Sequence, residues 1–199
     1  MTIFKIADGK QERVSSIGLV NFDVPTPKSF VIFFHTPHVK NGFENSCSET
    51  ACECALRHWN IVDWDQYRIH REGYHTFEGD VSEGDLGLIR LFNHEIFTTK
   101  TGLKIRLSAK IVQDADLEFL FHQLHKGRAP IVRIFTDRAR KNKHTQVVIG
   151  YNKKGLFLND NDDYNLENND PSKHYWIFQD FDQFLDRWSR NTIVVKPVI

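Results

Sequence analysis

The chain has 199 residues, a length that fits one domain of ordinary size and needs neither a disulfide nor a metal to fold. Its 26 lysines and arginines balance 26 aspartates and glutamates, and this zero net charge argues against a binder of nucleic acid or of an anionic membrane. With 40% hydrophobic residues and no apolar run near the ~20 residues of a membrane-spanning helix, the composition predicts a soluble globular protein.

The first 28 residues are polar and include Pro25 and Pro27, which disfavour helix, so this segment is predicted as a lead-in or an edge strand. Residues 29–199 are predicted to form a single domain. Its first element is a strand over 29–35, because this stretch is rich in aromatic and β-branched residues.

A helix is predicted over residues 47–59, after a polar loop. Small and apolar residues recur there at three- and four-residue steps, with Cys47 in the first turn, while Glu49, Glu53 and Arg57 take the opposite side. This pattern is typical of an amphipathic helix that packs one face against a core.

The remaining elements alternate between the two periods and end in several strands. Residues 60–80 show no clear period, so no element is predicted there, and the Asn- and Asp-rich stretch 159–171 is predicted as a loop. Residues 152–155 end in glycine between two strand-like runs, which predicts a hairpin. Helices are predicted over 85–97, 114–126 and 181–190, and strands over 103–107, 130–135, 144–151, 156–158, 176–178 and 193–195. Helices first and mostly antiparallel strands later predict an α+β fold.

The three cysteines are the first candidates for chemistry. Cys47, Cys52 and Cys54 are odd in number and close in sequence, so they do not form a disulfide framework, and a reducing compartment is expected. A helix N-terminus lowers a thiol pKa, and Cys47 is predicted beside the unpaired amides of a first turn. Cys54 shares the buried helix face and is expected to be a packed hydrophobe. The alternative for Cys47 is a buried, inert thiol.

A nucleophilic cysteine needs a base, and the base needs an acceptor that orients it. His144 opens a predicted strand, and the hairpin returns Asn159 and Asp160 alongside the start of that strand. An imidazole and a carboxylate therefore come within reach of each other. The alternative is a strand-edge histidine beside a solvated acidic loop.

Four stretches in matching order resemble one family, the papain-like cysteine peptidases related to bacteriocin double-glycine leader-processing enzymes. Asn45-Ser-Cys-Ser-Glu-Thr-Ala51 is similar to the family's Asn-x-Cys-Gly-Pro-Thr-Ser motif. His144-Thr-Gln-Val-Val-Ile-Gly-Tyr151, followed by Gly155-Leu-Phe-Leu-Asn-Asp160, resembles its His-x-Val-Val-Val-x-Gly-Tyr-Asp hairpin that ends in Val-Asn-Asp-Pro. Residues 116–132 and 181–197 are similar to its helix-Gly-strand unit and its closing Phe-x-x-x-Trp helix and strand. The likeness covers about 41–197.

The resemblance implies a papain-like fold, with an N-terminal helical half that places the nucleophile at a helix start and a C-terminal antiparallel sheet that carries histidine and aspartate. It implies Cys47 as nucleophile, His144 as general base and later acid, and Asp160 as the residue that orients His144, with Asn159 as the alternate. Asn41, six residues before Cys47, matches the family's oxyanion-stabilising amide, with Asn45 as a rival. The backbone amide of Cys47 would be the second donor.

The chain departs from the family pattern at three places. Asn41 stands where glutamine is usual, Ser48-Glu49 stand in place of Gly-Pro, and Asn161 replaces proline after Asn-Asp. A carboxylate at Glu49 would raise the thiol pKa if it leaned toward the sulfur. These departures motivate one alternative, a catalytically silent papain-like module that binds a peptide or a partner protein.

The sequence thus predicts a thiol hydrolase that acts on a peptide or amide bond through a Cys-His-Asp triad, with a peptide or protein as substrate. The same triad serves an acyltransferase or a deamidase, and these alternatives stay open. No cofactor is predicted, because the His-x-x-His pairs 35/38 and 122/125 lack partner ligands at zinc-site spacing. Residues 1–10 lack a signal-peptide pattern, so we expect a cytoplasmic protein or one exported by a route without a signal peptide.

Overall fold

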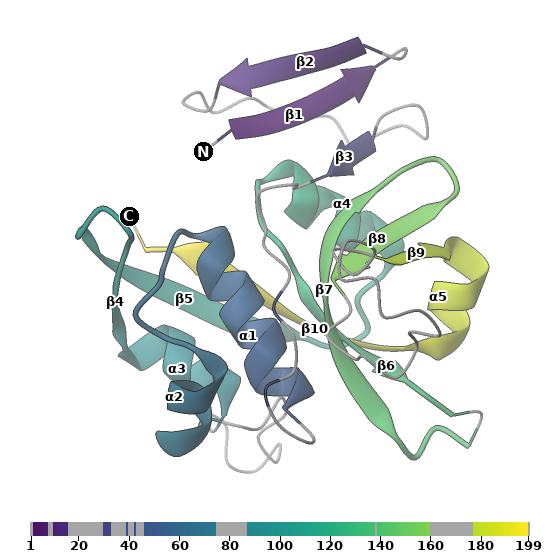
Figure 1. Ribbon diagram of the computed structural model, residues 1–199. Coiled ribbons are helices and arrows are strands. Elements are labelled where there is room, and N and C mark those ends of the chain that lie inside the picture. The colour runs from purple at the N-terminus through teal and green to yellow at the C-terminus, as the bar shows by residue number, and fades with distance from the viewer. Residues whose placement is uncertain are drawn as a thin grey trace.

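The structure is a computed structural model that describes residues 2–7, 10–15, 30–32, 39, 42, 46–74, 87–137, 139–159 and 177–198. The described residues form five helices and ten strands (Figure 1). The helices are α1 (Cys47–His58), α2 (Gln66–Arg71), α3 (Leu88–His94), α4 (Leu117–His125) and α5 (Phe181–Arg187). The strands are β1 (Thr2–Ala7), β2 (Lys10–Ser15), β3 (Phe30–Ile32), β4 (Ile96–Thr98), β5 (Lys104–Val112), β6 (Ile131–Phe135), β7 (Lys143–Tyr151), β8 (Gly155–Asn159), β9 (Ile177–Asp180) and β10 (Trp188–Pro197).

Strand β7 pairs with three other strands of an antiparallel sheet. The strand order is β2-β1-β3-β7-β6-β10-β5-β4, and β8 leaves this path to pair with β7 and β9. Residues 143–147 of β7 pair with β6, residues 150–151 pair with β3, and residues 147–151 pair with β8. Every residue of β7 after Lys143 is buried, including the polar residues at its start.

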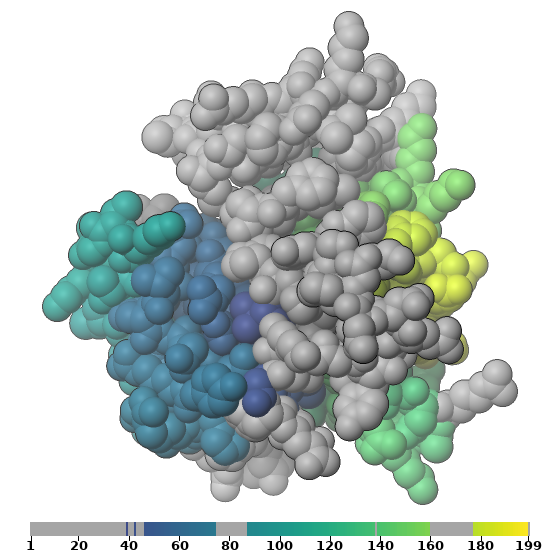
Figure 2. All heavy atoms as spheres, in the orientation of Figure 1, coloured from purple at the N-terminus to yellow at the C-terminus, as the bar shows by residue number. Residues whose placement is uncertain are grey.

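The described elements divide into two groups around α1. In Figure 1, α2, α3, β4 and β5 lie on one side of α1, and β6–β9 with α5 lie on the other. The space-filling view shows the same division, with blue and teal atoms on the left and green and yellow atoms on the right (Figure 2). Helix α1 joins both groups, because one of its faces packs into the main core with Ala51, Cys54 and Ala55.

The predicted α+β class is confirmed, because α1, α2 and α3 lie in the N-terminal half and most strands of the antiparallel sheet follow them. Each predicted helix and strand overlaps an observed one, but the helix predicted over 181–190 ends at Arg187, and residues 188–190 begin β10. Helix α3 begins only at residue 88, after Gly87 adopts a positive φ of 84°. Strand β10 is longer than predicted, because its pairing with β6 shifts register between Trp188 and Thr192 and hides the strand period.

Three features were not predicted. Strand β4 occupies residues 96–98, where the helix predicted over 85–97 was expected to end. Helix α2 lies in the stretch for which no element was expected; it is six residues long, too short to show a helical period, and its start is capped by Asp65, which accepts a hydrogen bond from the Arg68 amide at 2.8 Å. Strands β1 and β2 form a hairpin, and β1 also pairs with β3. The division of the chain into segment 1–28 and domain 29–199 stays a prediction.

Among the described helices, none combines the length and the apolar character that crossing a membrane requires.

Candidate active site

Cys47 is the first residue of α1 and is partly exposed. The first turn closes when the Thr50 amide donates to the carbonyl oxygen of Ser46 at 2.9 Å. The earlier amides of the turn have no partner within the helix, and they place positive potential beside a side chain at this position. The predicted location of Cys47 at a helix start is confirmed.

Strand β7 brings His144 and Thr145 to Cys47 from almost 100 positions along the chain. His144 is buried, with 6% of its surface exposed, and its ring is hydrogen-bonded to the Cys47 thiol. Thr145 contacts the same sulfur with its main-chain amide and its side chain. A second contact joins α1 and β7 beside it, because the hydroxyl oxygens of Ser48 and Thr145 lie 3.1 Å apart. The predicted pair of Cys47 and His144 therefore meets in the structure.

These contacts lower the pKa of the Cys47 thiol. Burial acts in the opposite direction and is the largest single influence, because it penalises the charged thiolate. The hydrogen bond and the charge of His144, together with the two hydrogen bonds from Thr145, outweigh burial and bring the pKa below its ordinary value. A thiol with a lowered pKa is the reactive kind, since the thiolate is the nucleophile.

The other two cysteines lie deeper in α1 and behave oppositely. Cys52 and Cys54 are fully buried. Burial raises the pKa of Cys52 well above the ordinary range, with added repulsion from Glu49 and Glu53, and burial raises the pKa of Cys54 to about 12. Both remain neutral thiols at physiological pH, as expected of packed hydrophobes.

The register of the β7–β8 hairpin places Asn159, one of the two candidates for the third residue of a triad. Asn159 is paired with Val147, three positions along β7 from His144. Because side chains alternate along a strand, Asn159 shares the face of Val147, and His144 points from the other face. The choice between Asn159 and Asp160 as the residue that orients His144 stays a prediction. Asp160, Asn41 and Asn45 lie outside the described residues.

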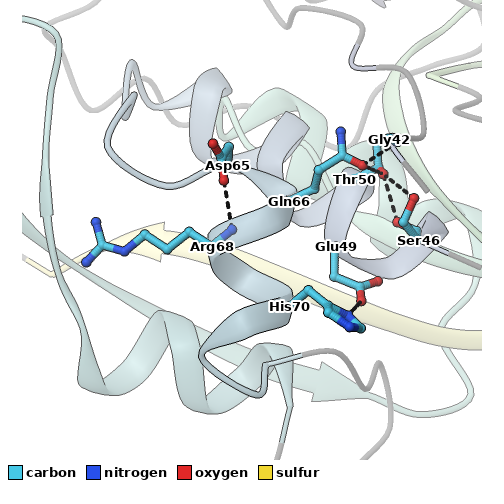
Figure 3. A network of polar contacts seen from close by, with 8 residues as sticks. All are labelled: Gly42, Ser46, Glu49, Thr50, Asp65, Gln66, Arg68 and His70. Atoms are coloured by element: carbon cyan, nitrogen blue, oxygen red, sulfur yellow. Dashed lines mark hydrogen bonds and ion pairs between the residues drawn. The ribbon is translucent and has the colours of Figure 1, made fainter.

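The side of α1 that was predicted to be polar is covered by α2. Glu49 and Glu53 are only 2% and 3% exposed, so the predicted solvent-facing side is wrong at these positions. Gln66 and His70 lie one helical turn apart on α2 and point toward Thr50 and Glu49 of α1 (Figure 3). His70 Nδ1 lies 2.9 Å from Glu49 Oε1.

The two residues after the nucleophile that depart from the family pattern, Ser48 and Glu49, both form side-chain contacts. The Ser48 hydroxyl binds Thr145, and the Glu49 carboxylate binds His70 on α2. The largest influences on the Cys47 pKa are its burial, His144 and Thr145, while repulsion from Glu49 helps to raise the pKa of Cys52. The role of Thr145 was not predicted, although its position directly after His144 offered a signal.

The described residues offer no place for a metal ion. No three His, Cys, Asp or Glu side chains among them lie close enough together to hold one. His125, from one of the His-x-x-His pairs, lies with Nε2 2.7 Å from the Tyr151 hydroxyl oxygen.

Two solved structures show the fold. The chain is similar to the peptidase domain of Streptococcus ComA, a bifunctional ABC transporter involved in a quorum-sensing pathway, with a TM-score of 0.57 and 14% identity over 82% of this chain and 100% of that one. It is also similar to a C39-like peptidase from Bacillus anthracis, with a TM-score of 0.56 and 14% identity over 85% of this chain and 98% of that one. No curated protein sequence matches the chain. The predicted papain-like fold is confirmed.

The sequence itself matches a family model over residues 30–194, from β3 to within β10. That model describes the Peptidase_C39 like family. The match spans both groups of elements and includes Cys47, His144 and Thr145. The expected kinship to papain-like cysteine peptidases is thereby confirmed, and the protein belongs to the Peptidase_C39 like family.

Proposed function

We propose that this protein is a thiol hydrolase that cleaves a peptide or amide bond of a peptide or protein substrate through an acyl-enzyme. One observation carries the proposal: the Cys47 thiol has a lowered pKa, although it is partly buried, because His144 and Thr145 contact it. Buried structural cysteines show the opposite shift, as Cys52 and Cys54 do in the same helix. A contact of this kind is typical of a nucleophile paired with its base.

In the first half-reaction, the Cys47 thiolate attacks the carbonyl carbon of the substrate. A sulfur–carbon bond forms, and the π electrons of the carbonyl move to its oxygen. When the tetrahedral intermediate collapses, the carbon–nitrogen bond breaks and His144 gives its proton to the leaving amine. The product is an acyl group bound to Cys47 and a neutral His144.

In the second half-reaction, His144 removes a proton from a water molecule that attacks the thioester carbon. The carbon–sulfur bond then breaks, the acid product leaves, and the Cys47 thiolate beside protonated His144 is restored. An amine in place of this water would make the enzyme an acyltransferase, and a glutamine side chain as substrate would make it a deamidase. The acceptor therefore decides between these related activities.

Asp160 is our proposed orienting residue for His144, and Asn41 is our proposed donor to the oxyanion. The choice of Asp160 over Asn159 rests on strand alternation, because Asn159 shares the face of Val147 and not that of His144. The choice of Asn41 rests on its six-residue spacing before Cys47. The backbone amide of Cys47 is the second proposed donor, as in other helix-start nucleophiles.

The first experiment measures the alkylation of each cysteine by iodoacetamide between pH 5 and 8, with mass spectrometry to identify the modified thiol. We expect Cys47 to be labelled at pH 6 while Cys52 and Cys54 stay unmodified, because only the first has a lowered pKa and surface access. Uniformly slow labelling of all three thiols would contradict the proposal and favour a silent peptide-binding module.

Turnover is then tested on denatured casein and on a mixture of synthetic peptides, with and without added glycinamide. Hydrolysis by the wild type that is lost in Cys47→Ala would support the peptidase. Products that carry glycinamide in excess of hydrolysed products would redirect the proposal to an acyltransferase. Selective labelling of Cys47 without any acyl transfer would contradict the hydrolase.

A further inference from the structure

Helix α2 holds the chain segment that precedes the nucleophile. Gln66, the first residue of α2, is 5% exposed, and its Oε1 accepts a hydrogen bond from the Gly42 amide at 2.7 Å. The same oxygen lies 2.9 Å from the hydroxyl oxygen of Thr50, in the first half of α1 (Figure 3). One buried side-chain oxygen therefore connects the pre-nucleophile segment, the nucleophile helix and α2.

Gly42 is held by two consecutive residues of α2. In addition to the bond from its amide to Gln66, its carbonyl oxygen accepts a hydrogen bond from the Tyr67 hydroxyl at 3.3 Å. The approach is close, because a Cβ at this position would run into the end of the Tyr67 side chain, which would have to move, and would lie 3.1 Å from Gln66 Cδ. The backbone of Gly42 is thus fixed on both of its polar groups.

Gln66 is itself anchored on α1. Its main-chain amide donates to Glu53 Oε2 at 2.8 Å, and Arg57 Nε donates to the other oxygen of the same carboxylate at 2.7 Å. Glu53 is buried, and Arg57 offsets its charge. The position of Gln66 relative to Cys47 is therefore set through the rigid helix that carries Cys47.

We infer that Gln66 is a positioning residue for the oxyanion-stabilising segment, an inference that rests on the proposed function. The Gly42 nitrogen is bonded to the carbonyl carbon of Asn41, our proposed oxyanion donor, so a hydrogen bond that fixes this nitrogen restrains the peptide bond that joins the two residues. Gln66 uses its oxygen, an acceptor, and so does not donate to an oxyanion from this atom. Its effect reaches the reaction through Gly42, because a donor displaced by about 1 Å loses much of its effect, up to about 100-fold in rate.

The test compares two reactions of Cys47 that differ in whether an oxyanion forms. Acylation by p-nitrophenyl acetate passes through a tetrahedral oxyanion, and alkylation by iodoacetamide does not. Gln66→Met keeps the size of the side chain and removes the acceptor. We expect this variant to slow acylation by about 10- to 100-fold and to leave the pH profile of alkylation within twofold of the wild type.

Two further variants separate positioning from general damage. Gln66→Glu retains an acceptor oxygen and should acylate within about threefold of the wild type. In an Asn41→Ala background, Gln66→Met should have little additional effect, because the group it positions is gone. If Gln66→Met does not fold, as judged by labelling of Cys52 and Cys54, Gly42→Ala displaces the same segment from its other side and should also slow acylation selectively.

The outcomes are distinguishable. Equal acylation rates in the wild type and Gln66→Met, with selective alkylation of Cys47 in both, would overturn the inference and leave the proposed function standing. Parallel losses of acylation and alkylation would also overturn it, because they would indicate damage to the α1–β7 contact. A wild type without selective alkylation of Cys47 would mean that the proposed function itself has failed.

Discussion

The first turn of α1 and its interior both carry cysteine thiols, but the pKa values of these thiols shift in opposite directions. Cys47 in the first turn has a lowered pKa, while Cys52 and Cys54 one and two turns later have raised ones. Burial pushes all three in the same direction, toward the neutral thiol. The difference therefore comes from partners, because only the first turn faces His144 and Thr145 of β7.

The lowered pKa of Cys47 depends on groups outside its own helix. The groups that overcome the burial of Cys47 belong to β7, which is fixed in the sheet by β6, β8 and β3. The reactive thiol is thus a property of the contact between α1 and β7.

Removal of the His144 ring should have the largest effect. In His144→Ala the Cys47 thiol loses its strongest pKa-lowering partner, while its burial remains. We expect alkylation at pH 6 to fall on the order of 100-fold and hydrolysis to fall by about 100- to 10,000-fold, since the general acid and base is lost as well. The measurement is the pH profile of iodoacetamide labelling, followed site by site.

His94→Ala provides the matched control, because His94 is exposed on α3 and belongs to neither α1 nor β7. It should label like the wild type. A profile for His144→Ala that overlays the wild type would mean that the contact between α1 and β7 does not distinguish Cys47 from the interior thiols.

The interior thiols should make the protein sensitive to alkali. Their folded pKa values are raised, so the native state keeps protons that the unfolded chain loses, and their contribution to stability is lost as pH rises above the ordinary thiol pKa of about 9 toward about 12. The free energy of unfolding should fall with a slope approaching about 1.4 kcal/mol per pH unit for each thiol. Urea titrations at pH 8, 9 and 10 measure the slope.

The double variant Cys52→Ala/Cys54→Ala isolates this contribution. It should be less stable at every pH because it leaves a cavity, but its stability should depend less on pH above 9. An unchanged slope would show that these thiols ionise as easily in the folded protein as in the unfolded chain.

Thr145 should matter less than His144 but in the same direction. Thr145→Val removes the hydroxyl that binds the Cys47 sulfur and leaves the main-chain amide in place. We expect the thiol pKa to rise and alkylation at pH 6 to slow by about 3- to 10-fold, the worth of one hydrogen bond. Thr145→Ser should restore the wild-type rate.

Ser48→Ala tests whether the loss comes from the sulfur contact. It breaks the same 3.1 Å contact between Ser48 and Thr145 but keeps the Thr145 hydroxyl. Alkylation should therefore change less than in Thr145→Val. A larger loss in Ser48→Ala would indicate that the two hydroxyls act by joining α1 to β7 and not by binding the thiolate.

The sequence predicts a feature of the structure when residues close together along the chain encode it. The helical period over residues 47–58 and the strand and turn signals of β7 and β8 are local, and they predicted these elements and the position of Cys47. The family-like motifs predicted the pairing of Cys47 with His144, which helical and strand periods alone do not indicate. Such motifs name residues, and they do not give the contacts of their neighbours.

The roles of Thr145 and of Glu49 depend on packing between distant segments. Thr145 binds the sulfur because β7 meets the first turn of α1 in a particular register, and no local pattern encodes that register. Glu49 was expected on an exposed side because α2 was not predicted. A six-residue helix with two buried residues shows too little periodicity to be found, although Asp65 supplies a capping signal.

The covered side of α1 provides the smallest expected effect on reactivity and the sharpest test of the comparison. His70→Ala removes the partner of the buried Glu49 carboxylate, and we expect a loss of about 1 kcal/mol in the free energy of unfolding. Alkylation of Cys47 at pH 6 should change less than twofold, because Glu49 acts on Cys52 and the groups that act on Cys47 lie on β7.

Glu49→Gln completes the test, because it removes the negative charge and keeps a side chain that can hydrogen-bond to His70. If one side of α1 carries the reactive thiol and the other side only packs against α2, this variant should also leave the alkylation profile of Cys47 unchanged. Alkylation several-fold faster than in the wild type at pH 6 would mean that the carboxylate restrains the thiol from across the helix. The glutamate that replaces the family's proline would then be a cause of reduced reactivity, and the separation between the two sides of α1 would be wrong.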